Sequence, residues 1–234
     1  MPTLDSTLLV GIAKALNIFS VLTYLLPLLI CLWRWHSLQP AYRQLILAGL
    51  LTLGSLNVLA EVGRVVYHNN LLCNYLIIWA ETLFLGWAYH QALHSRRSRQ
   101  LLLAALVFFA GVALAEFLYW HGISGAKTYT RMARGIVLVG AALLYFEQTL
   151  QELRNIHLER DPMFLVSVGV TLYYSGTLMV FAMEYATVRR HQFDQVWMMY
   201  SIQAVLMTVL NTLIALALWH TSRAEAKAET PILY

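Results

Sequence analysis

The chain has 234 residues, of which 59% are hydrophobic and only 12% are charged. A soluble domain is roughly half apolar and about a quarter charged, so this chain has too little charge to cover a water-exposed surface. The composition also excludes an intrinsically disordered chain, and two cysteines are too few for a disulfide scaffold. Together with a mean hydropathy of +0.61, it predicts a polytopic membrane protein.

Long runs without charged residues predict where the chain crosses the membrane. A bilayer core about 30 Å thick is crossed by about 20 helical residues. If a helix is allowed an occasional buried charge, the sequence predicts seven spans, at about 8–33, 43–66, 71–94, 101–121, 128–150, 163–186 and 194–220.

The fold class follows from these runs and from the short loops between them. The connections have four to twelve residues, which leaves no room for a further domain. The runs do not alternate like barrel strands, and backbone in lipid must be hydrogen-bonded within its own segment. We therefore expect an all-α fold, with one seven-helix transmembrane bundle over residues 1–220 and a flexible cytoplasmic tail over 221–234.

Basic residues are distributed unevenly between the two sets of loops, which predicts the orientation. One side carries Arg34, Arg43, Arg96, Arg97, Arg99, Arg154, Arg160, Arg223 and Lys227. The other side has only Lys127, Arg189 and Arg190 in its loops. The positive-inside rule then places the N-terminus outside and the C-terminus in the cytoplasm. The beginning of the chain lacks a basic region and a small-residue cleavage site, so no cleaved signal peptide is expected.

Polar and ionisable residues inside the spans are costly in lipid and are therefore candidates for a site. The candidate ligand-binding residues are Asn57, Glu61, Arg64, Asn74, Glu81, Glu116, Arg131, Arg134, Tyr173, Thr177, Glu184, Gln203 and Asn211. Almost all of them fall in the outer half of the predicted bundle. Four cations (with Lys14 included) stand against four carboxylates there, as mutual neutralisation requires. Two interpretations stay open: a structural network of ion pairs and hydrogen bonds, or a polar cavity open to the outside.

Several chemistries do not fit the residues present. A retinal Schiff base needs a lysine deep in the last span, and the only lysines are Lys14, Lys127 and Lys227. The histidines lie near span ends or in loops, which disfavours haem. The sequence contains no H-E-x-x-H, G-x-S-x-G or P-loop motif. We expect no cofactor, no metal site and no nucleic-acid partner, and nothing in the sequence requires the protein to be an enzyme.

The leading functional hypothesis is a receptor-like or small-ligand-binding membrane protein with a polar pocket in the outer half of the bundle. Its partners would be the bilayer, a small molecule from the outer side, and a cytoplasmic or membrane signalling protein. The alternative is a small-solute or proton-coupled transporter using Glu81, although no inverted repeat is found. A lipid-modifying enzyme with Glu61 or Glu184 as general base is a third hypothesis.

Several motifs suggest a family. They are Asn69-Asn70-Leu71-Leu72-Cys73-Asn74-Tyr75 leading to Trp79-Ala80-Glu81, Glu61 in the second span, Leu172-Tyr173-Tyr174-Ser175-Gly176-Thr177 in the sixth, and Asn211 in the seventh. This pattern resembles a large group of uncharacterised bacterial seven-helix proteins, in which an Asn-rich turn precedes an Asn and a mid-helix Glu. The resemblance implies a seven-helix fold in a bacterial inner membrane and no established activity.

The most specific structural prediction concerns the second and third spans. Glu61 and Arg64 are expected to face the bundle interior, with Arg131 or Arg134 as partner of Glu61 and Glu116 or Glu184 as partner of Arg64. Glu81 should lie deeper and farther from any cation. We therefore expect it to be hydrogen-bonded by an asparagine, a tyrosine or water.

Overall fold

The computed structural model describes residues 4–34, 40–66, 70–119, 128–152, 161–189 and 193–220. Within these ranges, the description excludes the side chains of residues 4–9, 40–45, 48, 61, 64–65, 152, 184–189 and 193–194. The predicted contacts of the Glu61, Arg64 and Glu184 side chains therefore lie outside the part of the chain that the structure describes. The predicted tail over 221–234 lies outside it as well.

The described part of the chain is built from helices alone. They are α1 (Leu4–Leu22), α2 (Leu25–Trp33), α3 (Pro40–Val66), α4 (Leu71–Ala92), α5 (Arg96–Tyr119), α6 (Thr128–Glu152), α7 (Pro162–Arg189) and α8 (Phe193–His220). The first predicted span corresponds to α1 and α2 together, and each of the other predicted spans coincides with one helix. The all-α fold class is confirmed.

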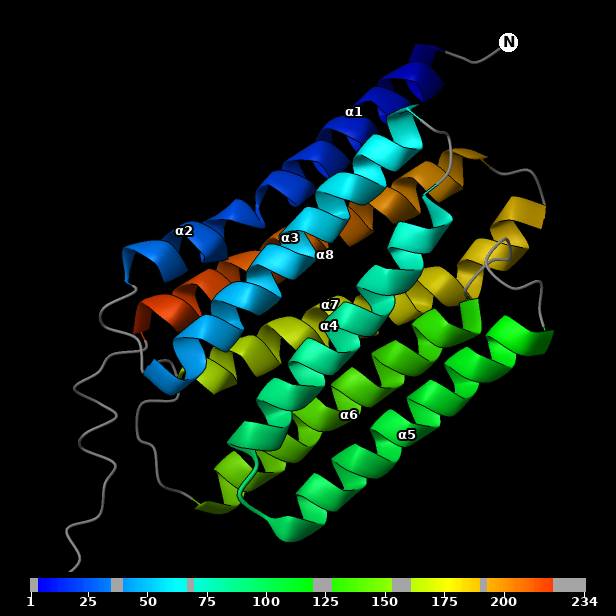
Figure 1. Ribbon diagram of the computed structural model, residues 1–234. Helices are drawn as coiled ribbons and strands as arrows, with labels where there is room; N and C mark the ends of the chain where they lie inside the picture. The colour runs from blue at the N-terminus through cyan, green and yellow to red at the C-terminus, as the bar shows by residue number, and fades with distance from the viewer. Residues whose placement is uncertain are drawn as a thin grey trace, which may run out of the picture.

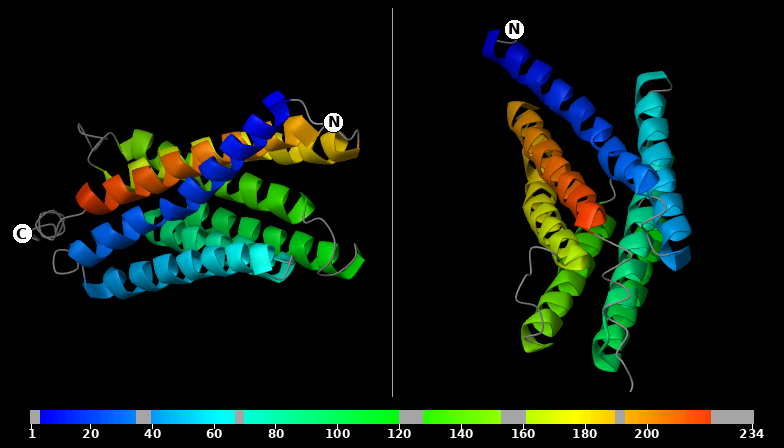
Figure 2. Two further views of the ribbon diagram at one scale, coloured as in Figure 1. Left: turned by 90° about the horizontal axis from the view of Figure 1, so that it is seen from above. Right: turned by 90° about the vertical axis from the view of Figure 1, so that its left-hand side faces the viewer.

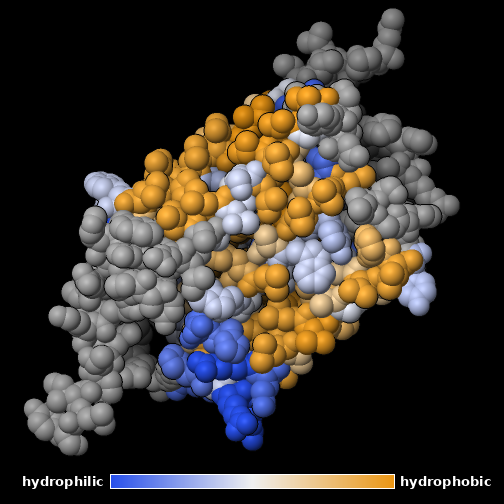
Figure 3. Space-filling view, in the orientation of Figure 1, coloured by the Kyte–Doolittle hydropathy of each residue, from blue (hydrophilic) through white to orange (hydrophobic). Residues whose placement is uncertain are grey.

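The helices have the length and the surface of membrane-spanning segments. Six stretches of the described residues are long and apolar enough to cross a bilayer, namely Val10–Trp33, Leu71–Ala92, Arg96–Tyr119, Thr128–Gln151, Pro162–Met183 and Gln195–His220. In α3 the apolar stretch is shorter, from Gly49 to Ala60. Large apolar side chains such as Val107, Leu118 and Met179 are exposed on the outside, and Figure 3 shows how apolar the surface is. A surface of this kind is stable in lipid and not in water, so the chain is an integral membrane protein.

The contacts between the helices form a closed ring, and α5 lies outside it at one edge of the bundle (Figure 1). Along the ring, α1 and α2 pack on α8, α8 on α7, α7 on α6, α6 on α4, α4 on α3, and α3 on α2. Helix α5 packs mainly on α6 and much less on α4. In both views of Figure 2, α1 and α3 lie close together near the junction of α1 with α2 and diverge toward the beginning of α1.

The two ends of the bundle are named here by one residue each. The Asn70 end contains the beginnings of α1, α4, α6 and α8 and the ends of α3, α5 and α7. The Arg96 end contains the ends of α2, α4, α6 and α8 and the beginnings of α3, α5 and α7.

A proline explains why the first predicted span is broken into two helices. Pro27 has no N–H, so the carbonyl of Thr23 four residues earlier loses its helical donor. The Leu26 N–H bonds that carbonyl instead, at 3.1 Å. The Thr23 hydroxyl donates to the Ser20 carbonyl at 2.6 Å and accepts from Asn211 Nδ2 at 2.8 Å. The break is therefore fixed to α8 by a buried hydrogen bond, and it presents Tyr24 to the interior of the ring.

Two carboxylates satisfy the first N–H groups of helices, which have no partner within their own helix. Glu116, near the end of α5, accepts from the N–H groups of Tyr129 and Thr130 at 3.1 and 2.7 Å and from the Thr130 hydroxyl. At the other end of the bundle, Asp161 accepts from the Met163 N–H at 2.9 Å at the beginning of α7. Glu116 thus fixes the register between α5 and α6.

Candidate functional site

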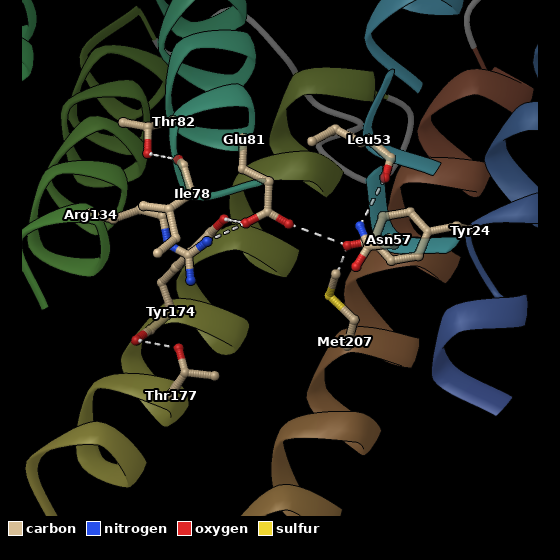
Figure 4. Close-up of polar contacts among 10 residues, drawn as sticks. All are labelled: Tyr24, Leu53, Asn57, Ile78, Glu81, Thr82, Arg134, Tyr174, Thr177 and Met207. Atoms are coloured by element: carbon tan, nitrogen blue, oxygen red, sulfur yellow. Dashed lines mark hydrogen bonds and ion pairs between the residues drawn. The ribbon is translucent and has the colours of Figure 1, made fainter. Parts of the chain in front are cut away.

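A buried cluster centred on Glu81 lies inside the ring (Figure 4). Glu81 Oε2 pairs with Arg134 Nη1 of α6 at 2.5 Å and accepts from the Tyr174 hydroxyl of α7 at 3.2 Å. Its other oxygen, Oε1, accepts from the Tyr24 hydroxyl at 3.2 Å. One carboxylate therefore ties together α4, α6, α7 and the α1–α2 break. Glu81 and Arg134 are only 6% and 5% exposed, so neither charge is left to bulk water.

The guanidinium of Arg134 contacts the Glu81 carboxylate and the Tyr174 ring, but one of its N–H donors has no acceptor among the described residues. Its carbon atom lies 5.3 Å from the centre of the Tyr174 ring, within the range of a cation–π contact. Arg134 Nε is buried and has no hydrogen-bond acceptor among the described residues. A buried donor without an acceptor costs free energy.

A cavity of about 380 Å³ opens from this cluster toward the Asn70 end of the bundle. Glu81, Arg134, Tyr24 and Tyr173 form its deep part. Amide side chains line it further out, contributed by Asn17 of α1, Asn57 of α3, Asn70 and Asn74 of α4, and Gln203 of α8. Amides both donate and accept hydrogen bonds, so they suit polar, uncharged parts of a ligand.

Basic and aromatic side chains complete the lining of the cavity. Lys14 of α1 and Arg131 of α6 are the cations nearer the Asn70 end, and Trp197 and Tyr200 contribute from α8. Arg131 lies over the ring of Phe181, with 5.3 Å between the guanidinium carbon and the ring centre. The cavity thus combines charge, amides and aromatic rings, and such polar groups fix the orientation of a small molecule in its site.

The cavity does not continue toward the Arg96 end, because buried apolar residues fill the bundle there. This layer contains Leu85 and Tyr89 of α4, Leu93 directly after α4, Leu138 of α6 and Leu210 of α8, packed with Leu102, Ala141, Ala142, Tyr145 and Val170. Helices α4, α6, α7 and α8 enter this layer one to three turns beyond the Glu81 cluster, and α2, α3 and α8 form a separate apolar cluster around Cys31, Leu50 and Leu218. The cluster therefore forms the floor of a pocket open at one end.

The structure brings together about half of the candidate ligand-binding residues named from the sequence. Those that line the cavity are Asn57, Asn74, Glu81, Arg131, Arg134, Tyr173 and Gln203. Three others lie outside its lining: Glu116 caps α6, Asn211 donates to Thr23, and the buried Thr177 hydroxyl donates to the Tyr174 carbonyl at 3.2 Å. The side chains of Glu61, Arg64 and Glu184 are among those not described.

The expectation about Glu81 was half right. Its tyrosine hydrogen bonds are confirmed, but its distance from any cation is wrong, because Arg134 reaches it directly. The error came from counting depth along each span. Arg134 lies two turns inside α6, and its long side chain reaches farther along the bundle than its Cα position suggests.

Tyr24 is the main residue of the site that the sequence reading missed. Its hydroxyl donates to Glu81 and lies 3.7 Å from the sulfur of Met207. Pro27 could have indicated this residue from the sequence. A proline inside a span leaves the carbonyl four residues earlier without its helical hydrogen bond, and so marks a break one turn before it. Tyr174 and Met207, which were not among the candidate site residues, also contact the cluster.

Among the residues that the structure describes, no group of three or more His, Cys, Asp or Glu side chains is placed to hold a metal ion. The interactions that the structure shows at the site are hydrogen bonds, the Glu81–Arg134 pair and aromatic contacts. In comparisons with known proteins, no protein-family model, curated protein or solved structure matches this chain.

Proposed function

We propose that this integral membrane protein is a receptor-like, seven-span protein that binds a small polar ligand in the cavity above Glu81. In this proposal the Asn70 end faces the outside of a bacterial inner membrane, so the ligand enters from there. The similarity to the bacterial seven-helix group described above is part of the proposal. The ligand's interactions with Glu81, Arg134 and Tyr24 would change the contacts among the helices that these residues join.

One observation carries the proposal: a buried ion pair forms the floor of a polar cavity of about 380 Å³ instead of being enclosed by apolar residues. Small-molecule pockets have volumes of roughly 300–1,000 Å³, so this cavity suits a small ligand.

The distribution of arginines supports the orientation. Arg34, Arg96, Arg97 and Arg99 all belong to the Arg96 end, and such residues gather on the cytoplasmic side of membrane proteins. The cavity opens at the opposite end, which the same rule places outside.

The receptor interpretation is favoured over transport by the apolar layer beneath the cluster. A transported solute needs a path to the other side, and this layer closes the cavity toward the Arg96 end. Tyr24, by contrast, links the cavity floor to the α1–α2 break, and α2 packs on α3 and α8 near the Arg96 end. A ligand that alters the Tyr24–Glu81 hydrogen bond therefore acts on a helix junction leading to the other face.

Cysteine accessibility in intact cells tests the pocket without knowledge of the ligand. In a Cys31→Ala, Cys73→Ser background, Gln203→Cys should react with a charged, membrane-impermeant thiol reagent added outside, because water in the cavity allows the thiolate to form. Val205→Cys is the matched control, since Val205 lies on the same helix and faces outward. Leu210→Cys, within the apolar layer, should also stay unlabelled.

Three results distinguish the alternatives. Equal, slow labelling of Gln203→Cys and Val205→Cys contradicts an aqueous pocket. Labelling of Gln203→Cys only from the cytoplasmic side contradicts the orientation. A small molecule that protects Gln203→Cys from labelling identifies a ligand, and flux of that molecule into proteoliposomes containing the protein would replace the receptor by a transporter.

A further inference from the structure

A second hollow lies on the outer surface between α5 and α6, away from the ligand cavity. It has a volume of about 570 Å³ and is lined almost entirely by apolar side chains. From α5 it is lined by Leu101, Leu102, Ala104, Ala105 and Phe108, and from α6 by Ile136, Val137, Gly140, Ala141, Leu143, Leu144 and Glu147. We call this hollow the α5–α6 groove.

The floor of the groove is hollow because its central residues are small. A Cβ atom added at Gly140 would meet no other atom within 4 Å, so the space above this glycine is open. On both sides the walls are long apolar side chains, including Leu101, Phe108 and Ile136, which are more than half exposed. The groove therefore presents a narrow apolar channel to the lipid.

Arginines lie at the Arg96 end of this groove. Arg97 precedes Leu101 by one helical turn, so it falls on the same face of α5 as Leu101, Ala104 and Phe108. Arg96 and Arg97 are both exposed. Figure 3 shows this part of the molecule as a strongly hydrophilic tip next to an apolar surface.

The turn between α4 and α5, which directly precedes these arginines, is bound to α6. Gln148 Oε1 accepts from the backbone N–H of His94 at 2.9 Å, and Gln148 Nε2 lies 2.6 Å from His94 Nδ1. Arg99 Nε donates to the Leu93 carbonyl at 2.5 Å, which closes the turn from the other side. The beginning of α5, which carries Arg96 and Arg97, is therefore fixed against α6 at the Arg96 end of the bundle.

The length of the groove indicates what fits it. Along α6 it extends from Ile136 to Glu147, which are eleven residue steps or about 16 Å of helix apart. That is about half of a hydrocarbon core roughly 30 Å thick, and so the depth of one leaflet. A partner transmembrane helix would use the full thickness, whereas the acyl chain of a lipid uses one leaflet.

We propose that the α5–α6 groove binds one anionic phospholipid from the leaflet at the Arg96 end. Its acyl chain lies along Ala104 and Gly140, and its phosphate is bound by Arg96 and Arg97. Three arginines begin α5, whereas Glu147 is the one carboxylate in the described lining, so the local charge attracts a negative headgroup. This site is independent of the ligand cavity and depends only on the protein being embedded in a bilayer.

Native mass spectrometry of the full chain in detergent tests the proposal, with phosphatidylglycerol and phosphatidylcholine of identical acyl chains as probes. Phosphatidylglycerol should bind more tightly. The Arg96→Gln, Arg97→Gln double variant should weaken its binding roughly thirty-fold, about five-fold for each charge lost at the membrane surface. The binding of phosphatidylcholine should change much less.

Gly140→Leu tests the groove itself, since the new side chain enters open space and fills the channel without a clash. It should lower the affinity for phosphatidylglycerol and leave the midpoint of thermal unfolding unchanged. Gly111→Leu on α5 is the matched control, because its Cβ also meets nothing within 4 Å and Gly111 lies outside the groove lining.

The proposal is overturned if the two lipids bind equally, or if neither the arginine variant nor Gly140→Leu lowers binding. It is also overturned if Gly140→Leu converts a dimer into a monomer, because a second copy of the chain then occupies the groove.

Discussion

Arg134→Gln is the most direct perturbation of the Glu81 cluster. It removes the cation 2.5 Å from Glu81 and leaves a carboxylate that is 6% exposed among the remaining partners. Breaking a buried pair by removing one member costs about 3–5 kcal/mol, because the other charge stays buried without compensation. Two tyrosine hydroxyls still donate to Glu81, and the cavity admits water, so we expect the lower part of this range.

For a chain of this length, about 1 kcal/mol shifts the unfolding midpoint by about 2–4 °C. Arg134→Gln should therefore lower the apparent midpoint by roughly 6–12 °C, measured by tryptophan fluorescence of the purified protein during heating. Gln151→Ala on the same helix is a control for a polar substitution away from the cluster, because among the described residues the exposed Gln151 amide bonds only to Glu147 one turn earlier in α6.

The double variant Glu81→Gln, Arg134→Gln separates the ion pair from general packing damage. Two uncharged amides leave no buried charge, so the double variant should be more stable than the sum of the two single losses predicts. A midpoint for Arg134→Gln within 2 °C of the unsubstituted protein would refute the reasoning. Strict additivity of the two single variants would also refute it, because it would mean that the two side chains do not interact.

Three further changes should have smaller effects on the same measured midpoint. Tyr24→Phe removes one hydrogen bond to a charged acceptor, so it should cost about 1.5–3 kcal/mol, and a change confined to the noise would exclude the Tyr24–Glu81 bond. Glu116→Ala leaves the first N–H groups of α6 without their acceptor and should cost about 1–3 kcal/mol, whereas Glu116→Gln should recover part of that loss. Asn211→Leu removes the donor to Thr23 at the helix break and should destabilise by about 1–3 kcal/mol, while Thr212→Ala on the exposed face of α8 should have almost no effect.

The sequence alone determined where the helices lie, because that depends on local hydropathy. Apolar runs such as 71–92 and 194–220 have no stable alternative to a helix in lipid, whatever their neighbours are. The observed α4 begins at Leu71, as predicted, and α8 covers Phe193–His220. The sequence also indicated that polar residues would gather toward one end of the bundle, since a buried charge must find a partner.

Only the tertiary structure decided which of these polar residues meet. Helical spacing places residues on a face, but it does not give the rotation of each helix or the reach of its side chains. Glu81 of α4 was therefore predicted to be remote from any cation. Arg134 of α6 nevertheless pairs with it. Glu116 was grouped with the ligand-binding residues for the same reason, whereas the fold uses it to cap α6.

The role of Tyr24 shows the same division between local and tertiary information. Pro27 locally requires an interruption of the helix near Thr23, and this much is encoded in the sequence. The interruption becomes part of a site only because α8 bonds Thr23 and α4 brings Glu81 to the Tyr24 hydroxyl. Hydropathy depends on each segment separately, whereas a pocket depends on how several segments pack, and so the ring of helices decided the site.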